Sequence, residues 1–226
     1  MRKIVIAIDG PAGAGKSSTA KLVAQKLGYV HIDTGAMYRA ITYRVLEEEI
    51  PFGETERIFA LAERSEIRLE SSQNSTKVFI SGRDVTDRLR SGEVNKAVSS
   101  VSSIQKVREV LVREQRKMAA EGGVVLEGRD IGTVVLPDAD LKIFMVANVS
   151  ERARRRKKEL ALNGIDVDEE SLTNDIEERD RKDSTRETSP LKQAQDAIML
   201  DTSHLTIEEQ VVFIVKKAKE ISEKKT

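Results

Sequence analysis

The sequence predicts a doubly wound α/β fold, with one sheet of five parallel strands and helices on both faces. Short runs of apolar, β-branched residues recur along the chain, and segments with helical spacing separate most of them. Strand–helix–strand units of this length imply parallel pairing. The predicted strands are 3–8, 28–32, 124–127, 141–146 and 197–200.

Helical spacing of apolar residues follows the first two strands, at 20–27 and 37–45. A longer helix with an apolar face at 107–118 leads to a glycine pair and the third strand. The last helix opens with a capping box, in which Thr206 and Glu209 satisfy each other's backbone donors. These segments supply the crossover helices that a parallel sheet requires.

Between residues 66 and 85 the spacing changes to alternation, which is typical of antiparallel strands. Two strands at 67–69 and 77–80 flank a polar turn at 71–75, and a short piece at 83–85 follows. We therefore expect a single domain with an insertion and a charged lid of two helical pieces around Asn163-Gly164. The expected bounds are a core of about 1–62, 103–150 and 187–226, a β-rich insertion of about 63–102, and a lid of about 151–186.

Composition limits the function classes. Lysine plus arginine and aspartate plus glutamate both number 38, so the net charge is zero and gives no general attraction to nucleic acid. The chain has no cysteine, which excludes disulfides and thiol nucleophiles and fits a reducing cytoplasm. We find no signal-peptide pattern and no apolar run of about 18 residues, so we expect a cytoplasmic monomer without a membrane partner.

The stretch from Gly10 to Ser17 fits the phosphate-binding pattern G-x-x-x-x-G-K-S/T, between a predicted strand and a predicted helix. Glycines let backbone N–H groups turn toward an anion, and the helix N-terminus adds its positive dipole end. Lys16 supplies a charge to the β- and γ-phosphates, and the Ser17 hydroxyl is the expected Mg²⁺ ligand. The predicted nucleoside triphosphate site comprises Gly10, Pro11, Ala12, Gly13, Ala14, Gly15, Lys16, Ser17 and Ser18.

Arginines, rather than histidines, gather where the strands end. The chain has two histidines: we expect His31 to be a structural side chain within a strand and His204 to be exposed. Arg39 and Arg129 lie close after strand ends, where ligands of such sheets bind. An acceptor phosphate monoester, with a second pKa of about 6, is already an anion and needs positive charge rather than a general base.

Four segments together resemble bacterial cytidylate kinases, which belong to the P-loop nucleoside monophosphate kinases. They are 8–11 running into the phosphate-binding loop, Asp-Thr-Gly-Ala-Met-Tyr-Arg at 33–39, Gly-Arg-Asp-Ile-Gly-Thr at 128–133, and Arg-Asp-Arg-Lys-Asp at 179–183. The resemblance covers essentially the whole chain, including the insertion after the second helix.

The resemblance implies transfer of the γ-phosphoryl group of Mg·ATP to CMP or dCMP. It implies a catalytic set of Lys16, Arg129, Arg155 and Arg186, with Arg155 and Arg156 as the lid arginines that reach ATP. By the same resemblance, Thr34, Arg39, Arg129 and Arg186 hold the acceptor phosphate, Ser99, Arg108 and Asp130 approach cytosine, and Asp183 takes the sugar hydroxyls. Tyr38, within the 33–39 segment, is included with the acceptor residues.

Three alternatives remain open from the sequence. The acceptor could be UMP, AMP or a metabolite hydroxyl. A hydroxyl acceptor would need a positioned base, and Asp33 or Asp130 could serve. The chain could instead bind nucleotide as a switch without phosphoryl transfer. The arginine-rich 150–158 stretch could bind RNA, although zero net charge, 4% aromatic residues and interspersed glutamates disfavour this.

Overall fold

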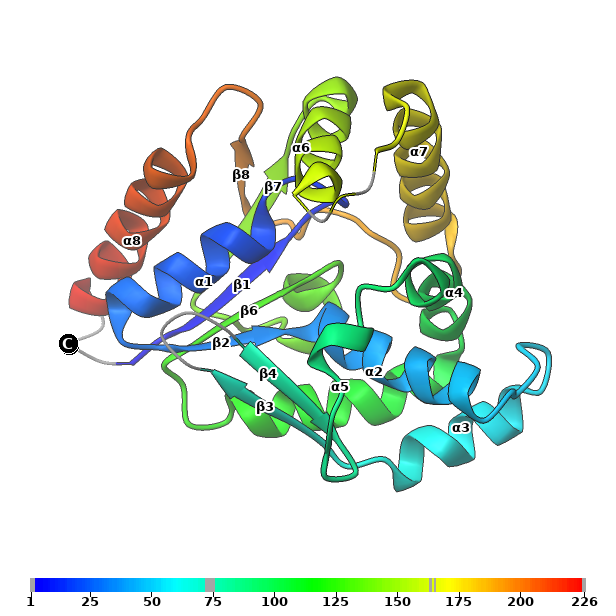
Figure 1. Ribbon diagram of the computed structural model, residues 1–226. Helices are drawn as coiled ribbons and strands as arrows, with labels where there is room; N and C mark the ends of the chain where they lie inside the picture. Colours follow the sequence, from blue (N-terminus) through cyan, green and yellow to red (C-terminus); the bar gives the residue numbers. More distant parts are fainter. Residues whose placement is uncertain (1–2, 72–75, 163, 165, 225–226) are drawn as a thin grey trace. The chain divides into compact units, whose positions relative to one another are not determined.

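The computed structural model describes residues 3–71, 76–162, 164 and 166–224. The chain forms two compact units, Met1–His31 with Gly122–Thr226 (the first unit) and Ile32–Glu121 (the second unit). Figure 1 labels their elements along the chain. Each unit is described by itself.

A five-stranded parallel sheet with the order β2-β6-β1-β7-β8 confirms the predicted fold class. Its middle strand is almost wholly buried, as expected for a parallel strand covered by helices. Asp9, the last residue of this strand, pairs in register with Gly128 on one side and Phe144 on the other, so three strands end at one edge. The strands are β1 (Val5–Asp9), β2 (Val30–Asp33), β6 (Val124–Gly128), β7 (Leu141–Val146) and β8 (Ile198–Asp201).

Helices α1 (Lys16–Leu27) and α8 (Ile207–Lys224) lie side by side in the first unit (Figure 1). Their apolar faces share a core with the strands, to which Val23 and Ile214 contribute fully buried side chains. The predicted capping box is present at the start of α8. The Thr206 N–H donates to Glu209 Oε2 at 2.8 Å, and the Glu209 N–H donates to Thr206 Oγ1 at 3.2 Å.

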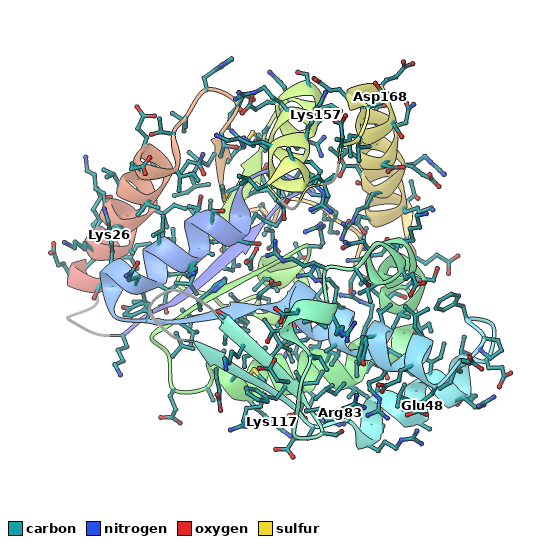
Figure 2. The ribbon with its side chains drawn as sticks, in the orientation of Figure 1. Lys26, Glu48, Arg83, Lys117, Lys157 and Asp168 are labelled. Atoms are coloured by element: carbon teal, nitrogen blue, oxygen red, sulfur yellow. The ribbon has the colours of Figure 1, made fainter. Side chains whose placement is uncertain are left out.

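Helices α6 (Val149–Ala161) and α7 (Glu169–Thr185) form a second pair, called here the α6–α7 pair. A small cluster of Ala153, Leu172 and Ile176 joins them, and most of their other residues are charged or polar. Asp168, labelled in Figure 2, caps α7 by accepting the Ser171 N–H at 2.9 Å. The two helical pieces are as predicted, whereas Asn163, the first residue of the predicted break, lies outside the described residues.

The segment after β6 differs from the predicted loop. Residues Ile131–Val135 form a π-helical turn, η2, in which the Asp130 carbonyl accepts the N–H groups of Val134 and Val135 at 2.9 and 3.1 Å. Gly128 to Asp130 connect the strand to this turn. The loop prediction was therefore wrong from Ile131 onward, because a π turn is rare and has no sequence signal of its own.

The second unit combines four helices with a three-stranded antiparallel sheet in its described residues. Strand β4 pairs with β3 and β5, with Ile67 opposite Ile80, which confirms the predicted antiparallel strands. Residues 72–75 of the predicted turn lie outside the described residues. The elements are α2 (Thr34–Glu47), α3 (Thr55–Arg64), β3 (Ile67–Ser71), β4 (Thr76–Ile80), β5 (Arg83–Asp84), η1 (Thr86–Arg88), α4 (Gly92–Ser102) and α5 (Gln105–Ala119).

Helices α3 and α4 were missed by the sequence patterns. Helix α3 buries Ile58, Leu61 and Ala62 in the core of the second unit, together with side chains of α2 and α5. Helix α4 starts at a serine cap, where Ser91 Oγ accepts the Val94 N–H at 3.3 Å. The serines at 99, 100 and 102 lie in its last turn. No helix among the described residues is long and apolar enough to cross a membrane.

Gly10 allows a test of the tight junction between β1 and the phosphate-binding loop. Its φ is 145°, and an added Cβ would lie 2.1 Å from the Met145 carbonyl oxygen of β7. We expect Gly10→Ala to lower the free energy of unfolding by about 3 kcal/mol or more in urea titrations, because buried backbone must move.

The matched control is Gly28→Ala, at the αL cap of α1, where an added Cβ meets nothing within 4 Å. It should cost only about 1–2 kcal/mol, from the backbone conformation alone. Equal losses in the two variants would contradict the packing argument.

Candidate active site

The phosphate-binding loop connects β1 to the first turn of α1. Gly13 and Gly15 have φ values of 76° and 92°, which turn the backbone in a way that L-residues rarely adopt. A Cβ on Gly13 would lie 3.0 Å from the Arg152 Cβ of α6, so the loop packs closely against that helix. The predicted residues Ser17 and Ser18 lie exposed in the first turn of α1. This strand–loop–helix arrangement is the one that anion-binding loops require.

Lys16 is a buried cation at the centre of this loop. Its Nζ donates to the Pro11 carbonyl oxygen at 2.7 Å, inside the loop itself. Burial holds the pKa of Lys16 well below its usual value, and the nearby Arg129 charge adds to the effect while Glu127 opposes it. Bound phosphates would supply the missing negative charge. The residues present therefore fit a triphosphate.

Ser17, His31 and Glu127 form a hydrogen-bonded chain beside the loop. Ser17 Oγ donates to Glu127 Oε2 at 2.7 Å, and His31 Nε2 lies 3.0 Å from Glu127 Oε1. His31 is buried, as expected of a structural histidine, and His204 is exposed. Glu127 was missed as a site residue, although an acidic residue at the end of an apolar strand was the available signal.

Asp9 connects the end of β1 to the π turn. Its carboxylate accepts the Ile131 N–H at 2.8 Å and the Gly132 N–H at 2.7 Å. Burial raises the pKa of Asp9 to about 6; the two backbone hydrogen bonds and Lys16 lower it, and Asp130 raises it further. Asp9 was not among the site residues predicted from the sequence, because its partners lie more than 120 residues away.

Four predicted acceptor residues of the first unit lie in one ionic group, called here the arginine–aspartate cluster: Arg129, Asp130, Asp183 and Arg186. Arg129 Nε donates to Asp183 Oδ2 at 2.8 Å, and Arg186 Nη2 lies 3.8 Å from Asp130 Oδ1. Burial works to raise the pKa of Asp183, but the charge and hydrogen bond of Arg129, together with the charges of Arg179 and Arg186, more than offset this and the pKa is lowered. Both aspartates are buried. The cluster holds an array of charges with little access to water.

Arginines of α6 contact the phosphate-binding loop and its surroundings. Arg152, not chosen from the sequence, is buried and donates through Nη1 to the Ala12 carbonyl at 3.1 Å and to Asp180 Oδ2 at 2.5 Å. This guanidinium therefore links the loop to both helices of the α6–α7 pair.

The two predicted lid arginines differ in their surroundings. Arg155 donates to the Thr202 carbonyl and hydroxyl, at 2.5 and 3.1 Å. Thr202 Oγ1 in turn lies 3.0 Å from the Ala14 carbonyl. Arg156 pairs instead with Glu159 of its own helix at 2.8 Å. Arg155 is thus the one attached to the loop's surroundings in this structure.

The remaining predicted acceptor residues belong to the second unit. Asp33 caps α2 by accepting the Ala36 N–H at 2.9 Å, and it accepts from Arg39 Nη2 at 3.0 Å. Both carboxylate oxygens are thus engaged, which disfavours Asp33 as a general base.

Tyr38 and Arg108 form a second contact in this unit. The Arg108 guanidinium lies over the Tyr38 ring at 5.3 Å and donates to the Ser102 carbonyl at 3.2 Å. Thr34 is buried in the first turn of α2, and Ser99 is partly buried on α4.

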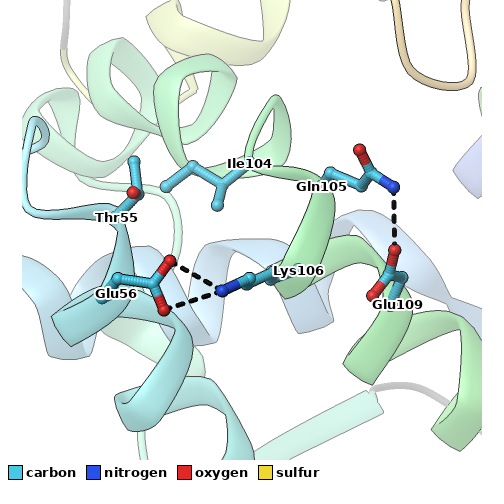
Figure 3. A pocket seen from close by; sticks show the side chains of 6 residues that line it. All are labelled: Thr55, Glu56, Ile104, Gln105, Lys106 and Glu109. Carbon is cyan, nitrogen blue, oxygen red and sulfur yellow. Dashed lines mark hydrogen bonds and ion pairs between the residues drawn. The ribbon is translucent and has the colours of Figure 1, made fainter.

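Figure 3 shows a pocket of about 420 Å³ in the second unit, at the starts of α3 and α5. Its walls include the ion pair of Lys106 with Glu56 at 2.7 Å and the hydrogen bond from Gln105 to Glu109 at 2.9 Å. Thr55 and Ile104 complete the lining. None of these six residues belongs to the predicted site. Among the described residues, no group of three or more histidine, aspartate or glutamate side chains could hold a metal ion.

Sequence comparison finds a family and relatives that match most of the chain. The family described as cytidylate kinase matches residues 6–220. A cytidylate kinase from Enterococcus faecalis is 53% identical over 95% of each chain. One from Bacillus subtilis is 49% identical over 92% of this chain and 93% of its own, and one from Lactococcus lactis is 50% identical over 98% and 100%.

Solved structures share the fold at low sequence identity. A gluconokinase from Sinorhizobium meliloti has a TM-score of 0.52 and 14% identity, covering 99% of this chain and 97% of its own. An uncharacterized protein from Eubacterium ventriosum has a TM-score of 0.53 and 14% identity, covering 97% and 99%. At this identity, the likeness concerns the fold alone.

The raised pKa of Asp9 predicts a pH dependence of stability. The folded state binds this proton more tightly than the unfolded chain, so the stabilising contribution is complete below the usual pKa of 3.8 and is lost as pH rises through about 6. Between pH 4 and 7 the free energy of unfolding should fall by about 2.4 kcal/mol relative to Asp9→Asn, which has no titrating group at this position.

Urea unfolding of both proteins across this pH range measures the difference. Other titrating groups are common to the two proteins and largely cancel. A difference that is flat, or that has the opposite slope, would contradict the raised pKa.

Proposed function

Because the chain belongs to the cytidylate kinase family, we propose that it transfers the γ-phosphoryl group of Mg·ATP to CMP or dCMP. The products are ADP and CDP or dCDP. The observation that carries the proposal is the arginine–aspartate cluster, whose Arg129 charge acts on the buried Lys16 of the phosphate-binding loop. This effect of Arg129 on Lys16 supports a donor-phosphate site and a second anion site close to each other in the first unit.

The proposed donor site uses the phosphate-binding loop and the start of α1. Backbone N–H groups of Gly10 and of residues 12–18, together with the Lys16 ammonium, would bind the ATP phosphates, and Ser17 would hold Mg²⁺. Mg²⁺, when bound, supplies positive charge to the β- and γ-phosphates. Arg155, held near Gly15, and Arg156 are the proposed α6 arginines for ATP.

The proposed acceptor-phosphate residues of the first unit are Arg129 and Arg186. The family likeness also proposes Thr34 and Arg39, which belong to the second unit. An acceptor oxygen forms a bond to the γ-phosphorus while the bond to the β-phosphate bridging oxygen breaks and ADP leaves. The acceptor is already ionised, so no proton has to be removed by a base. The arginines offset the repulsion between the two anions and stabilise the charge of the transition state.

Asp130 is the proposed determinant of the base. Cytosine presents an N4 amino donor where uracil presents an O4 acceptor, so a carboxylate attracts the first and repels the second. The family likeness also proposes Ser99, Arg108 and Tyr38 as acceptor residues, and these belong to the second unit. Asp183, ionised beside Arg129, is proposed to accept from the sugar hydroxyls.

The competing hypotheses give different results in one assay. Acceptor-dependent ADP release identifies CMP, UMP, AMP or a hydroxyl compound as substrate, whereas a switch gives no such release.

We also propose a cytoplasmic monomer without a nucleic-acid partner, in keeping with the absence of cysteine and the zero net charge.

Lys16→Ala tests the donor site. We expect kcat with CMP and ATP to fall at least about 100-fold, because the charge that faces the transferred phosphoryl group is lost, while CMP binding by calorimetry stays within about twofold. Lys26→Ala is the matched control, since this exposed lysine lies in the last turn of the same helix (Figure 2). Wild-type protein without CMP-dependent ADP formation would refute the proposed function itself.

Asp130→Ala tests base recognition. We expect kcat/KM for CMP to fall about 10- to 100-fold, with a much smaller loss for UMP, because the carboxylate favours only the amino group. Asp138→Ala, at an exposed aspartate nearby in sequence, should leave both values unchanged. Equal losses on CMP and UMP would argue against direct recognition by Asp130.

A further inference from the structure

The π turn after β6 has an unusual cap. Asp130 occupies the N-cap position of η2, with φ −145° and ψ 26°, yet its side chain makes no capping hydrogen bond. The cap comes from Asp9, in another strand, whose two carboxylate oxygens accept the N–H groups of Ile131 and Gly132. Asp9 thus makes the capping hydrogen bonds that Asp130 does not make.

This exchange of partners affects where the Asp130 carboxylate lies. An N-cap aspartate ordinarily accepts the N–H of the second or third helical residue. Here the N–H of the second residue of the turn, Gly132, already donates to Asp9. The Asp130 carboxylate lies instead 3.8 Å from Arg186, in the arginine–aspartate cluster.

We propose that Asp9 is a positioning residue for acceptor specificity: by capping the π turn, it keeps the Asp130 carboxylate in the cluster and available to the acceptor base. The proposal rests on the role proposed above for Asp130. It concerns a residue of the donor-side strand that itself touches neither substrate.

Packing and charge around Asp9 support this role. Asp9 and Asp130 are 5% and 4% exposed, so water competes little for either carboxylate. A Cβ on Gly132 would lie 3.1 Å from the Lys142 side chain and 3.4 Å from Asp9 Oδ2, so the turn sits directly on its cap. The two carboxylates also repel each other, since each ionised group disfavours the other. Repulsion and geometry both direct Asp130 away from Asp9.

Asp9→Asn tests the proposal with little change of volume. The amide keeps one acceptor oxygen, but its NH₂ group faces a backbone N–H, so one of the two capping bonds is lost and Asp130 can turn onto the free donor. We expect the ratio of kcat/KM for CMP to that for UMP to fall about tenfold. The KM for ATP should change less than twofold.

Asp140→Asn is the matched control. Asp140 Oδ2 also accepts a backbone N–H of β1, from Val5 at 2.8 Å, but at the other end of the strand. Its CMP-to-UMP ratio should equal that of the wild type. A general weakening of β1 would instead change both variants and raise the KM for ATP.

A double-mutant cycle separates the failure of this inference from the failure of the proposed function. If Asp9 acts through Asp130, Asp9→Asn should change the CMP-to-UMP ratio less than twofold in the Asp130→Ala background. A wild-type ratio in Asp9→Asn, with a reduced ratio in Asp130→Ala, overturns the role of Asp9 alone. A wild-type ratio in Asp130→Ala overturns base recognition by Asp130, and the present inference with it.

Should Asp9→Asn fail to fold, Asp9→Ser provides the same comparison with a smaller polar side chain. Folding is checked by thermal melting with saturating ATP before the ratios are compared. The same tenfold fall in the ratio is expected, and a wild-type ratio overturns the proposal.

Discussion

A buried ammonium group is the constraint on which the first unit depends. The Lys16 ammonium is shielded from water and donates to one carbonyl oxygen of its own loop. Its lowered pKa reflects the free-energy cost of that burial. The surrounding structure reduces the cost only in part, since Glu127 and Asp9 attract the charge while Arg129 and Arg179 repel it. An anion that enters the loop resolves this conflict. The burial of Lys16 therefore agrees with the phosphate-binding role proposed for this loop.

The cost of burying positive charge also explains the hydrogen bonds of the neighbouring arginines. Arg129 pairs with Asp183, and Arg152 pairs with Asp180, so each guanidinium has a carboxylate partner before any substrate arrives. Such partners hold the positive charges in place and prevent them from repelling one another. In the proposed function these pairs would limit the affinity for phosphate, because a substrate would have to compete with or join an existing pair.

Local signals predicted much of the fold and the donor site. The phosphate-binding loop, the five parallel strands and the capping box of α8 each follow from residues that are adjacent or one turn apart. The contributions of Asp9, Glu127 and Arg152 could not be found in this way. Their partners are 122, 110 and 140 residues distant in sequence, and only the strand order brings them together.

The grouping of Arg129, Asp130, Asp183 and Arg186 shows a second limit of the sequence. Resemblance named all four as acceptor residues, but it carried no information on which would pair with which. Arg129 and Asp183 are 54 positions apart in sequence, and the segment between them includes all of α6 and most of α7. Their ion pair therefore depends on how that segment returns to the sheet. The π turn was missed for a related reason, since its cap comes from β1.

The small apolar cluster of the α6–α7 pair has a consequence for how this part of the chain responds to its surroundings. Three buried apolar residues contribute far less to local stability than the large core beneath α1 and α8. Segments with so little apolar burial open at a fraction of the global unfolding free energy, and they exchange amide hydrogens and meet proteases in that open form. The α6–α7 pair should accordingly be the last part of the first unit to become protected on folding. A bound polyphosphate that contacts Arg152 and Arg155 would protect the α6–α7 pair most from amide exchange and proteolysis.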